Sequence, residues 1–417
     1  MKRTLLAVSV CLSVTPAYAV DWALNSTLSE SVEANDNPYL RALAGGAFNS
    51  YSTIAANAVA RTPTSRFTFD GDVNYRKYWG PGSDGAPSES LGGDAKLHYE
   101  TFGKDSADRN YINAGWHRGS TAFALLGQLG IVTNTRGFTD QTNVSAGIDR
   151  AITNLDITSL SARSTYTSYD PGVQGTTFYD SGATASWRHR VNSIATLTAS
   201  SDVEVLNFNN SLNTQITILR ENVGIDATLS PVLSYSGTVG VAHTQTDRGS
   251  PALSLTPFSP SSSGSSSDTG FITNMILTYK MFPDTTLNFT GVQSISPSVV
   301  GSLIELTSIG AGANYTVNSH ESLSFSASGS RTTSSGTTSD FLSASVTYGY
   351  TLTREWNAQL SYRYLHRLAD SGTASSGLII DPVTGILIPT TSGLGPASSN
   401  SLMLVVSRSI SILPDGN

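Results

Sequence analysis

The sequence contains a single cysteine, Cys11, among 417 residues. Cys11 lies in the N-terminal stretch "MKRTLLAVSVCLSVTPAYA", where two basic residues precede a short apolar core that ends in Ala17-Tyr18-Ala19. This is the pattern of a secretory signal peptide that is cleaved after Ala19. We therefore predict a signal peptide over residues 1–19 and an exported chain over 20–417. Without a thiol, that chain has no disulfides, no cysteine metal site and no cysteine nucleophile.

Long hydrophobic runs and basic clusters are also missing. After residue 19 no apolar run approaches the roughly 18 residues that a membrane-spanning helix needs, which excludes a helical membrane protein. A transmembrane β-barrel is not excluded, because each of its strands gives a much weaker hydropathy signal. The net charge is −7 and only 13% of the residues are charged. An acidic exported chain without a basic cluster is not expected to bind nucleic acid.

Catalytic motifs are equally scarce. The sequence has neither G-x-S-x-G nor H-E-x-x-H, the motifs of a common hydrolase family and of zinc proteases. His117 and Ser120 lie close together in "GWHRGST", which raises a hydrolase hypothesis, but a polar histidine beside an aromatic belt is the simpler interpretation. Asp70 and Asp72 share one face of a strand, which is a weak indication of a metal site. We predict that the protein is not an enzyme and needs no metal or cofactor.

The chain does contain stretches in which polar and apolar residues alternate strictly. In "ESLSFSASGSR", residues 321–331, the apolar and small side chains fall on one parity and five serines fall on the other. A period of two is the signature of a β-strand with two different faces. "TSDFLSASVTYGYTLT" and "EWNAQLSYRYLHR" repeat it. The strands of a soluble sandwich would share an apolar core. In these strands, one face carries small and aromatic residues and the opposite face carries polar residues that contact water.

Strand candidates cover almost the whole exported chain. The first runs from Trp22 to Ala34 and the last from Leu402 to Ile412. Eight hairpins with tight turns are predicted between them. Their turns lie at "ARTPTSRF", "WHRGSTAF", "RAITNLDI", "RHRVNSIA", "ATLSPVLSY", "KMFPDTTL", "VNSHESL" and "YTLTREWN". The other connections are longer and rich in Gly, Pro and Ser, above all 247–270 and 369–398. This layout predicts an all-β fold, a transmembrane antiparallel up-and-down β-barrel of about 18 strands (16–18), with short periplasmic turns and long extracellular loops.

In such a barrel the wall of serines lines a lumen, and the apolar parity contacts the lipids of a Gram-negative outer membrane. Tyr279, Tyr315 and Tyr350 precede short turns on the apolar parity and are interpreted as one aromatic girdle. Two features fit less well. Arg408 falls on the apolar parity, from which it could snorkel to the interface, and the phase changes near Leu219, which we interpret as a β-bulge.

The charged residues on the inward parity are the candidate lumen-lining residues: Asp70, Asp72, Arg76, Arg188, Arg190, Asp202, Glu204, Arg363 and Arg367. Opposed acidic and basic ladders would create a transverse field that selects what permeates. A solvated wall without particular selectivity is an equally good interpretation of the same residues.

Three segments carry a resemblance to a known family. "ESVEANDNPYLR" near the start, and "EWNAQLSYRYLHRLADSGTASS" and "SSNSLMLVVSRSIS" near the end, resemble outer-membrane β-barrel porins that are encoded with exopolysaccharide export genes. The resemblance implies a channel that assists the export of an exopolysaccharide, with outer-membrane lipids and polysaccharide export machinery as partners. The alternative is a general or solute-selective diffusion porin. A third hypothesis is a barrel enzyme or a surface adhesin that uses the long loops.

Overall fold

The computed structural model describes residues 20–38, 40, 45–81, 89–103, 108–120, 137–170, 176–210, 213–248, 265–297, 303–334, 337–368, 377–380, 387–390 and 396–413. The predicted signal peptide lies outside the described residues. The strands are β1 (Asp21–Asn35), β2 (Ala47–Arg61), β3 (Ser65–Trp79), β4 (Glu89–Phe102), β5 (Arg109–Ser120), β6 (Phe138–Ala151), β7 (Asp156–Tyr169), β8 (Phe178–Arg190), β9 (Ala195–Phe208), β10 (Gln215–Ser230), β11 (Leu233–Asp247), β12 (Ser265–Phe282), β13 (Thr285–Pro297), β14 (Leu303–Thr316), β15 (Glu321–Ser334), β16 (Thr337–Thr351), β17 (Trp356–Arg367), β18 (Gly377–Ile380), β19 (Leu387–Thr390) and β20 (Ala397–Leu413). No helix in this part of the chain is long and apolar enough to cross a membrane.

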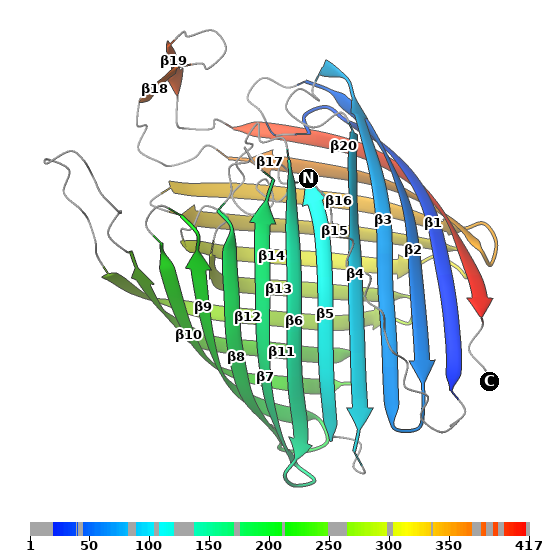
Figure 1. Cartoon of the computed structure of the whole chain (residues 1–417). Helices are drawn as coiled ribbons and strands as arrows, with labels where there is room; N and C mark the ends of the chain where they lie inside the picture. The colour runs from blue at the N-terminus through cyan, green and yellow to red at the C-terminus, as the bar shows by residue number, and fades with distance from the viewer. Residues whose placement is uncertain are drawn as a thin grey trace, which may run out of the picture.

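Eighteen of these strands form one closed antiparallel barrel (Figure 1). Each strand pairs with the next along the chain, and β1 pairs with both β2 and β20, so that the sheet has no free edge. Closure satisfies every ladder of backbone hydrogen bonds, which is what a sheet in lipid requires. The predicted barrel and its strand number are confirmed. The two remaining strands, β18 and β19, pair only with each other inside the connection that we expected to be an irregular loop.

Short turns join the strands at one end of the barrel, and several are held by the same device. A Thr or Asn side-chain oxygen accepts hydrogen bonds from the backbone amides two and three residues further on. This occurs at Thr62, Thr153, Asn192, Asn318 and Thr353. Such local side-chain bonds favour a turn over continued pairing. These residue types therefore fix where the strands reverse.

One of the eight predicted turns is misplaced. The described part of "WHRGSTAF", residues 116–120, is not a turn, because β5 continues to Ser120. Gly119 is a strand glycine over which the His117 ring lies: a Cβ on Gly119 would come within 2.7 Å of that ring. The turn between β4 and β5 is instead closed by the Gly103 amide, which donates to the Asp108 carbonyl at 2.8 Å.

The predicted bulge near Leu219 is also wrong. β10 pairs with β9 and β11 without a shift of register from Gln215 to Ala227. The alternation is continuous, but Ile216 and Ile218 occupy inward positions and are fully buried. The apparent change of phase in the sequence is a change in what the inner face carries, from polar to apolar.

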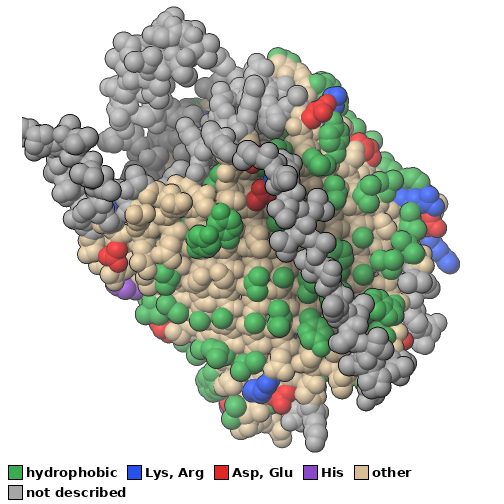
Figure 2. All heavy atoms as spheres, in the orientation of Figure 1, with side chains coloured by type: hydrophobic (Ala, Val, Ile, Leu, Met, Phe, Trp, Pro, Cys, Tyr) green, Lys and Arg blue, Asp and Glu red, His purple; other side chains and the backbone are tan. Residues whose placement is uncertain are grey.

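The outer face of the barrel is largely apolar. Ile54 and Ile309 are 60% and 70% exposed, far more than a soluble core would allow, and hydrophobic side chains spread over the middle of the face in Figure 2. Tyr279, Tyr315 and Tyr350 lie on this face next to short turns, as a girdle requires.

Arg408 lies on the outer face as well, at the short-turn end of β20. Its guanidinium donates to the Glu355 carboxylate at 2.9 Å and lies 5.6 Å from the centre of the Trp356 ring. Paired in this way beside the turns, the arginine keeps its charge at the rim of the apolar band, which agrees with the snorkelling interpretation.

Candidate functional site: the barrel interior

Serine hydroxyls cover the inner face of β15 and β16. Ser328 and Ser343 face each other with their oxygens 2.6 Å apart, and Ser326 and Ser345 do the same at 2.7 Å. Ser328 and Ser343 line an interior cavity of about 370 Å³ together with Arg76 of β3. β3 lies on another part of the barrel wall, so these serines point into the barrel and not toward lipid. Each hydroxyl can still accept one further hydrogen bond from water or a solute.

On β3, Asp70, Asp72 and Arg76 occupy the inward positions, opposite in parity to the exposed Phe69, Val73 and Tyr75. Each has a polar or aromatic neighbour. Asp70 accepts a hydrogen bond from the Asn57 amide and Asp72 accepts one from Asn74. Arg76 lies 4.6 Å from the centre of the Tyr51 ring and donates to the Tyr78 hydroxyl.

Asp202 and Glu204 on β9 are also inward, but they are buried and paired with two arginines that sequence reasoning missed. Arg163 donates to Asp202 at 2.6 Å and lies 3.5 Å from Glu204. Arg220 donates to Asp202 at 2.8 Å and to Glu204. The two carboxylates are thus neutralised locally and present little charge to the lumen. The inward parity of Arg163 and Arg220 was readable in the sequence, but their pairing needs the register of four adjacent strands, β7 to β10.

The four inward arginines predicted from sequence differ in environment. Arg188 and Arg190 lie near the short-turn end of β8, and no ion pair joins them to any of the described residues. Arg190 lines a second interior cavity, of about 340 Å³, together with Asp226. Arg363 on β17 bonds Glu33 of β1 at 3.2 Å and remains 59% exposed. Arg367 is completely buried, so it does not meet solvent in the lumen.

A further charged group near the short-turn end was not predicted. Arg109 donates to Asp149 at 2.7 Å and lies 3.6 Å from Glu100, which is also 3.5 Å from His98. The network extends along the inner faces of β4, β5 and β6. Two groups of inward charged side chains, around Asp149 and around Asp202, therefore occur as ion pairs.

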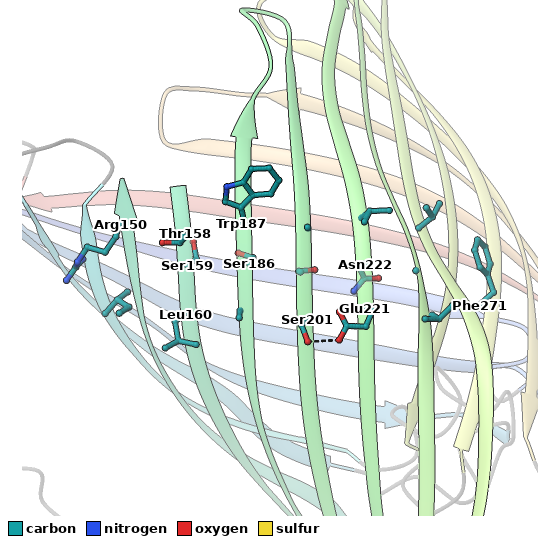
Figure 3. Close-up of a pocket in the computed structure, with 18 residues that line it drawn as sticks. Arg150, Thr158, Ser159, Leu160, Ser186, Trp187, Ser201, Glu221, Asn222 and Phe271 are labelled. Carbon is teal, nitrogen blue, oxygen red and sulfur yellow. Dashed lines mark hydrogen bonds between the residues drawn. The ribbon is translucent and has the colours of Figure 1, made fainter. Parts of the chain in front are cut away.

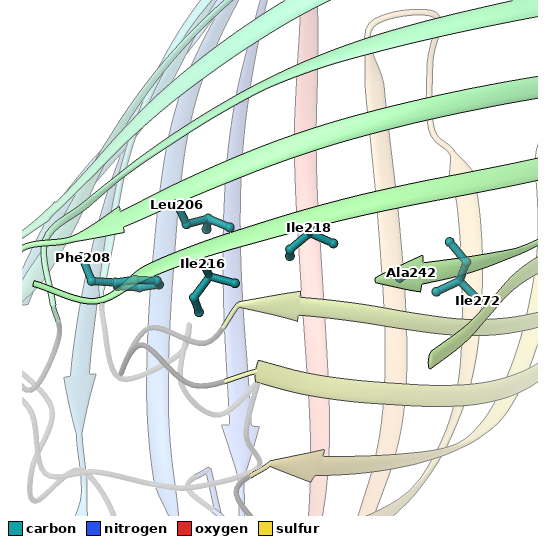
Figure 4. Close-up of a cluster of buried hydrophobic side chains, with 6 residues drawn as sticks. All are labelled: Leu206, Phe208, Ile216, Ile218, Ala242 and Ile272. Carbon is teal, nitrogen blue, oxygen red and sulfur yellow. The ribbon is translucent and has the colours of Figure 1, made fainter. Parts of the chain in front are cut away.

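The long-loop end of the interior contains an apolar cluster (Figure 4). Its buried members come from β9, β10, β11 and β12: Leu206, Phe208, Ile216, Ile218, Ala242 and Ile272. Ile295 and Leu303, at the adjoining ends of β13 and β14, pack against it. Arg220 donates to the Ile295 carbonyl at 3.3 Å, which joins the β13 end to the ion-paired network. This end of β13 is thereby drawn toward the interior.

A groove of about 780 Å³ lies on the outer face (Figure 3). Leu160, Trp187, Val223 and Phe271 form its rims, and small residues on the strands between them form its floor. The Ser201 hydroxyl donates to Glu221 at 2.7 Å on the same face. Such a surface suits contact with the acyl chains of lipids and is not arranged as a binding site for a polar solute.

The described interior gives no support to the hydrolase hypothesis. His117 and Ser120 lie at opposite parity on β5, and the His117 ring nitrogen pairs with Asp94 at 2.9 Å and not with Ser120. Within the described residues, no three His, Cys, Asp or Glu side chains converge as metal ligands, including around Asp70 and Asp72.

A closed barrel with an apolar outer face, aromatic residues near one rim and a polar interior has the construction of an outer-membrane β-barrel. No family model matches the chain, and no curated protein matches it in sequence. Among solved structures it is similar to the copper transporter OprC, with a TM-score of 0.49 and 10% identity over 95% of this chain and 82% of that chain.

Two further similar structures are OccAB2 of Acinetobacter baumannii and opdK of Pseudomonas aeruginosa. OccAB2 has a TM-score of 0.46 and 11% identity over 94% of this chain and 98% of its own. For opdK the TM-score is 0.44 and the identity 12%, over 93% of this chain and 99% of its own. Identities this low transfer no activity to the present chain, so its function has to be sought in its own geometry.

Proposed function

We propose that the protein is an outer-membrane diffusion channel, general or solute-selective, for small hydrophilic solutes. The observation that carries the proposal is the opposition of two faces on the same strands: lipid-compatible residues outside, and hydroxyl and charged groups around unfilled cavities inside. A barrel of 16–18 strands is wide enough to leave an aqueous lumen. Contact with outer-membrane lipids belongs to this proposal.

The nature of the inner wall favours passive passage. A solute must leave as easily as it enters, so weak and repeated contacts serve a channel better than one strong site. The serine ladder of β15 and β16 offers such contacts, and the ion pairs of Asp202 and Glu204 with Arg163 and Arg220 keep these two carboxylates from trapping a counter-ion.

Export of an exopolysaccharide, together with export machinery as a partner, rests only on the sequence resemblance. No comparison supports it, and the long-loop end of the interior contains buried hydrophobic side chains where a passing polymer would need a hydrated path. We therefore favour diffusion of small solutes. Non-enzymatic function remains a prediction.

Of the sequence-predicted lumen residues, Asp70, Asp72, Arg76, Arg188, Arg190 and Arg363 are proposed to meet permeating solutes. Asp202, Glu204 and Arg367 are proposed to support the wall, because their side chains are buried. Arg188 and Arg190 are the best candidates for an effect on ion preference, since no described acid pairs with them.

Liposome swelling tests the proposal. Liposomes that contain the purified barrel should swell in solutions of small sugars and amino acids, at rates that fall steeply as the solute grows. Swelling no faster than that of protein-free liposomes, with the barrel shown to be folded, would contradict a diffusion channel.

A further inference from the structure

Two described residues of the connection after β1 are buried. Asn37 is 3% exposed and Leu40 is 1% exposed, although both lie in a connection between strands. The Leu40 amide donates to the Asn37 carbonyl at 3.2 Å, and Leu40 has a φ of 48°. This left-handed conformation is uncommon for a residue other than glycine. Surrounding contacts must hold it in place.

The residues directly before Leu40 are held by the start of the last strand. The Asp36 carboxylate accepts two hydrogen bonds from Asn400, from its backbone amide and its side-chain amide, both at 2.7 Å. The Asn37 side chain donates to the Ser398 carbonyl at 3.0 Å. Asn35 accepts from the Ser399 hydroxyl at 2.9 Å. We call Asn35, Asp36 and Asn37, with their partners on β20, the clasp.

The clasp joins the two ends of the barrel sheet. The ladder between β1 and β20 ends at the pair Asn35 and Ser401, and the clasp continues it by side-chain bonds. Hydrogen bonds to a carboxylate are among the stronger ones in proteins. Because Pro38 and Leu40 follow at once, the clasp also fixes where these two residues enter the barrel.

Pro38 and Leu40 lie in the interior near β14 and β15, which are separated from β1 by β20, β17 and β16. They line the cavity of about 370 Å³ with Leu306 of β14 and Ser328 of β15. Arg76 of β3 and Arg363 of β17 line the same cavity. The cavity is thus bounded by strands from both sides of the closure between β1 and β20, with the inward-turned connection between them.

We propose that Pro38 forms a fixed constriction of the channel, that the buried Leu40 anchors it and that the clasp positions it. The proposal rests on the proposed function, because a constriction has meaning only in a conducting barrel. It gives the sequence Asn35-Asp36-Asn37-Pro38 a structural role, and it places the narrow zone level with Ser328 and Ser330 on β15. Small solutes would be sorted by size there, between Pro38 and the serine face.

Two serines on one strand test the position of the constriction. Ser328 and Ser324 both face inward on β15, but only Ser328 lines the cavity with Leu40. Ser328→Cys and Ser324→Cys barrels are placed in planar bilayers and treated with a bulky thiol reagent. Modification at Ser328 should remove most of the current, and modification at Ser324 should remove little. The unsubstituted protein, treated in the same way, gives the background.

Equal loss at both positions, or none at Ser328 after labelling has been verified by mass spectrometry, would overturn the constriction. A barrel without any current before the reagent is added would instead contradict the proposed function. The two failures are therefore distinguishable.

The clasp is tested in the Ser328→Cys background. Asp36→Ala removes both bonds to Asn400, so the reagent should block less of the current. Asp36→Asn keeps an acceptor for the Asn400 amide and should restore most of the block. Asp247→Ala, at the long-loop end of β11 and bonded to Gln245 of its own strand, is the matched control and should behave like the parent.

Pro38→Ala is a second test that leaves the bonds of the clasp intact. It should raise the conductance and let larger polymers enter, because Pro38 is partly exposed and lines the cavity. If Asp36→Ala does not fold, Pro38→Ala and Asp36→Asn still test the proposal. Parent-like conductance and polymer exclusion in folded Pro38→Ala would overturn the assignment.

Discussion

The walls formed by β7 to β10 and by β13 to β16 are both polar toward the lumen, but they are built in different ways. The first carries Arg163 and Arg220 in one ion-pair network with the buried carboxylates of Asp202 and Glu204. The described inward positions of β13 to β16 carry hydroxyl, amide, small or apolar side chains and no charge. The first wall pairs Asp202 and Glu204 with arginines and leaves Arg188 and Arg190 of β8 outside any described ion pair, whereas the described second wall carries no charge to pair.

The difference concerns stability as much as permeation. A buried carboxylate is tolerated only while its partners remain, so each member of the network depends on the others. A serine hydroxyl that faces water can hydrogen-bond water instead of its neighbour, so the loss of that neighbour costs little folding free energy. The charged wall should therefore respond sharply to single substitutions, and the serine wall should tolerate them.

The largest effect is expected for Arg220→Ala. It leaves Asp202 and Glu204 in a buried site with one arginine, which should cost about 3 kcal/mol of unfolding free energy. Urea unfolding in detergent or lipid measures it. Arg363→Ala is the control, because Arg363 is also inward and ion-paired but is 59% exposed, and an exposed pair contributes about 0.5 kcal/mol. Equal costs would show that the two walls do not differ in this way.

A smaller effect is expected from the pair Phe325→Asp and Ser326→Asp, which are adjacent on β15 but face opposite sides. Phe325 is 45% exposed on the outer face, so a carboxylate there enters lipid and should cost about 2 kcal/mol or less, depending on depth. Ser326→Asp places the same carboxylate beside water and should assemble like the parent. Folding yield into lipid vesicles distinguishes them, and matching yields would reverse the assignment of faces.

The smallest effect is expected for Ser343→Ala. Its hydroxyl bonds Ser328 at 2.6 Å, yet both groups can bond water instead, so the cost should be about 0.5 kcal/mol. The same unfolding assay measures it. A loss as large as that of Arg220→Ala would mean that the serine wall is a rigid network and not a solvated surface.

The same contrast explains what could be predicted from the sequence. The alternation of Leu323, Phe325 and Ala327 with serines defines a strand and both of its faces, because a period of two needs no knowledge of neighbours. Repeated along the chain, it predicted a closed barrel of about 18 strands, and the strand number is confirmed. The short turns were largely predictable too, because Thr and Asn side chains fix them locally.

Contacts between strands were not predictable. Arg163 and Asp202 are 39 residues apart and meet only through the register of three strands. Asp36 and Asn400 are 364 residues apart and meet because the barrel closes. Ile216 and Ile218 were misjudged because an apolar residue was assumed to face lipid, whereas these two pack inside against Leu206 and Ala242. Periodicity gives the face of a residue but not its partner.

Ion conduction through the purified barrel in a planar bilayer tests the central claim most directly. The account predicts discrete open-channel steps, and a preference for anions that falls in the Arg188→Gln/Arg190→Gln double variant. Arg331→Gln serves as the control: Arg331 pairs with Asp340 on the outer parity and should leave the reversal potential unchanged. A folded barrel that never conducts would contradict the claim that the polar faces of these strands enclose an open aqueous path.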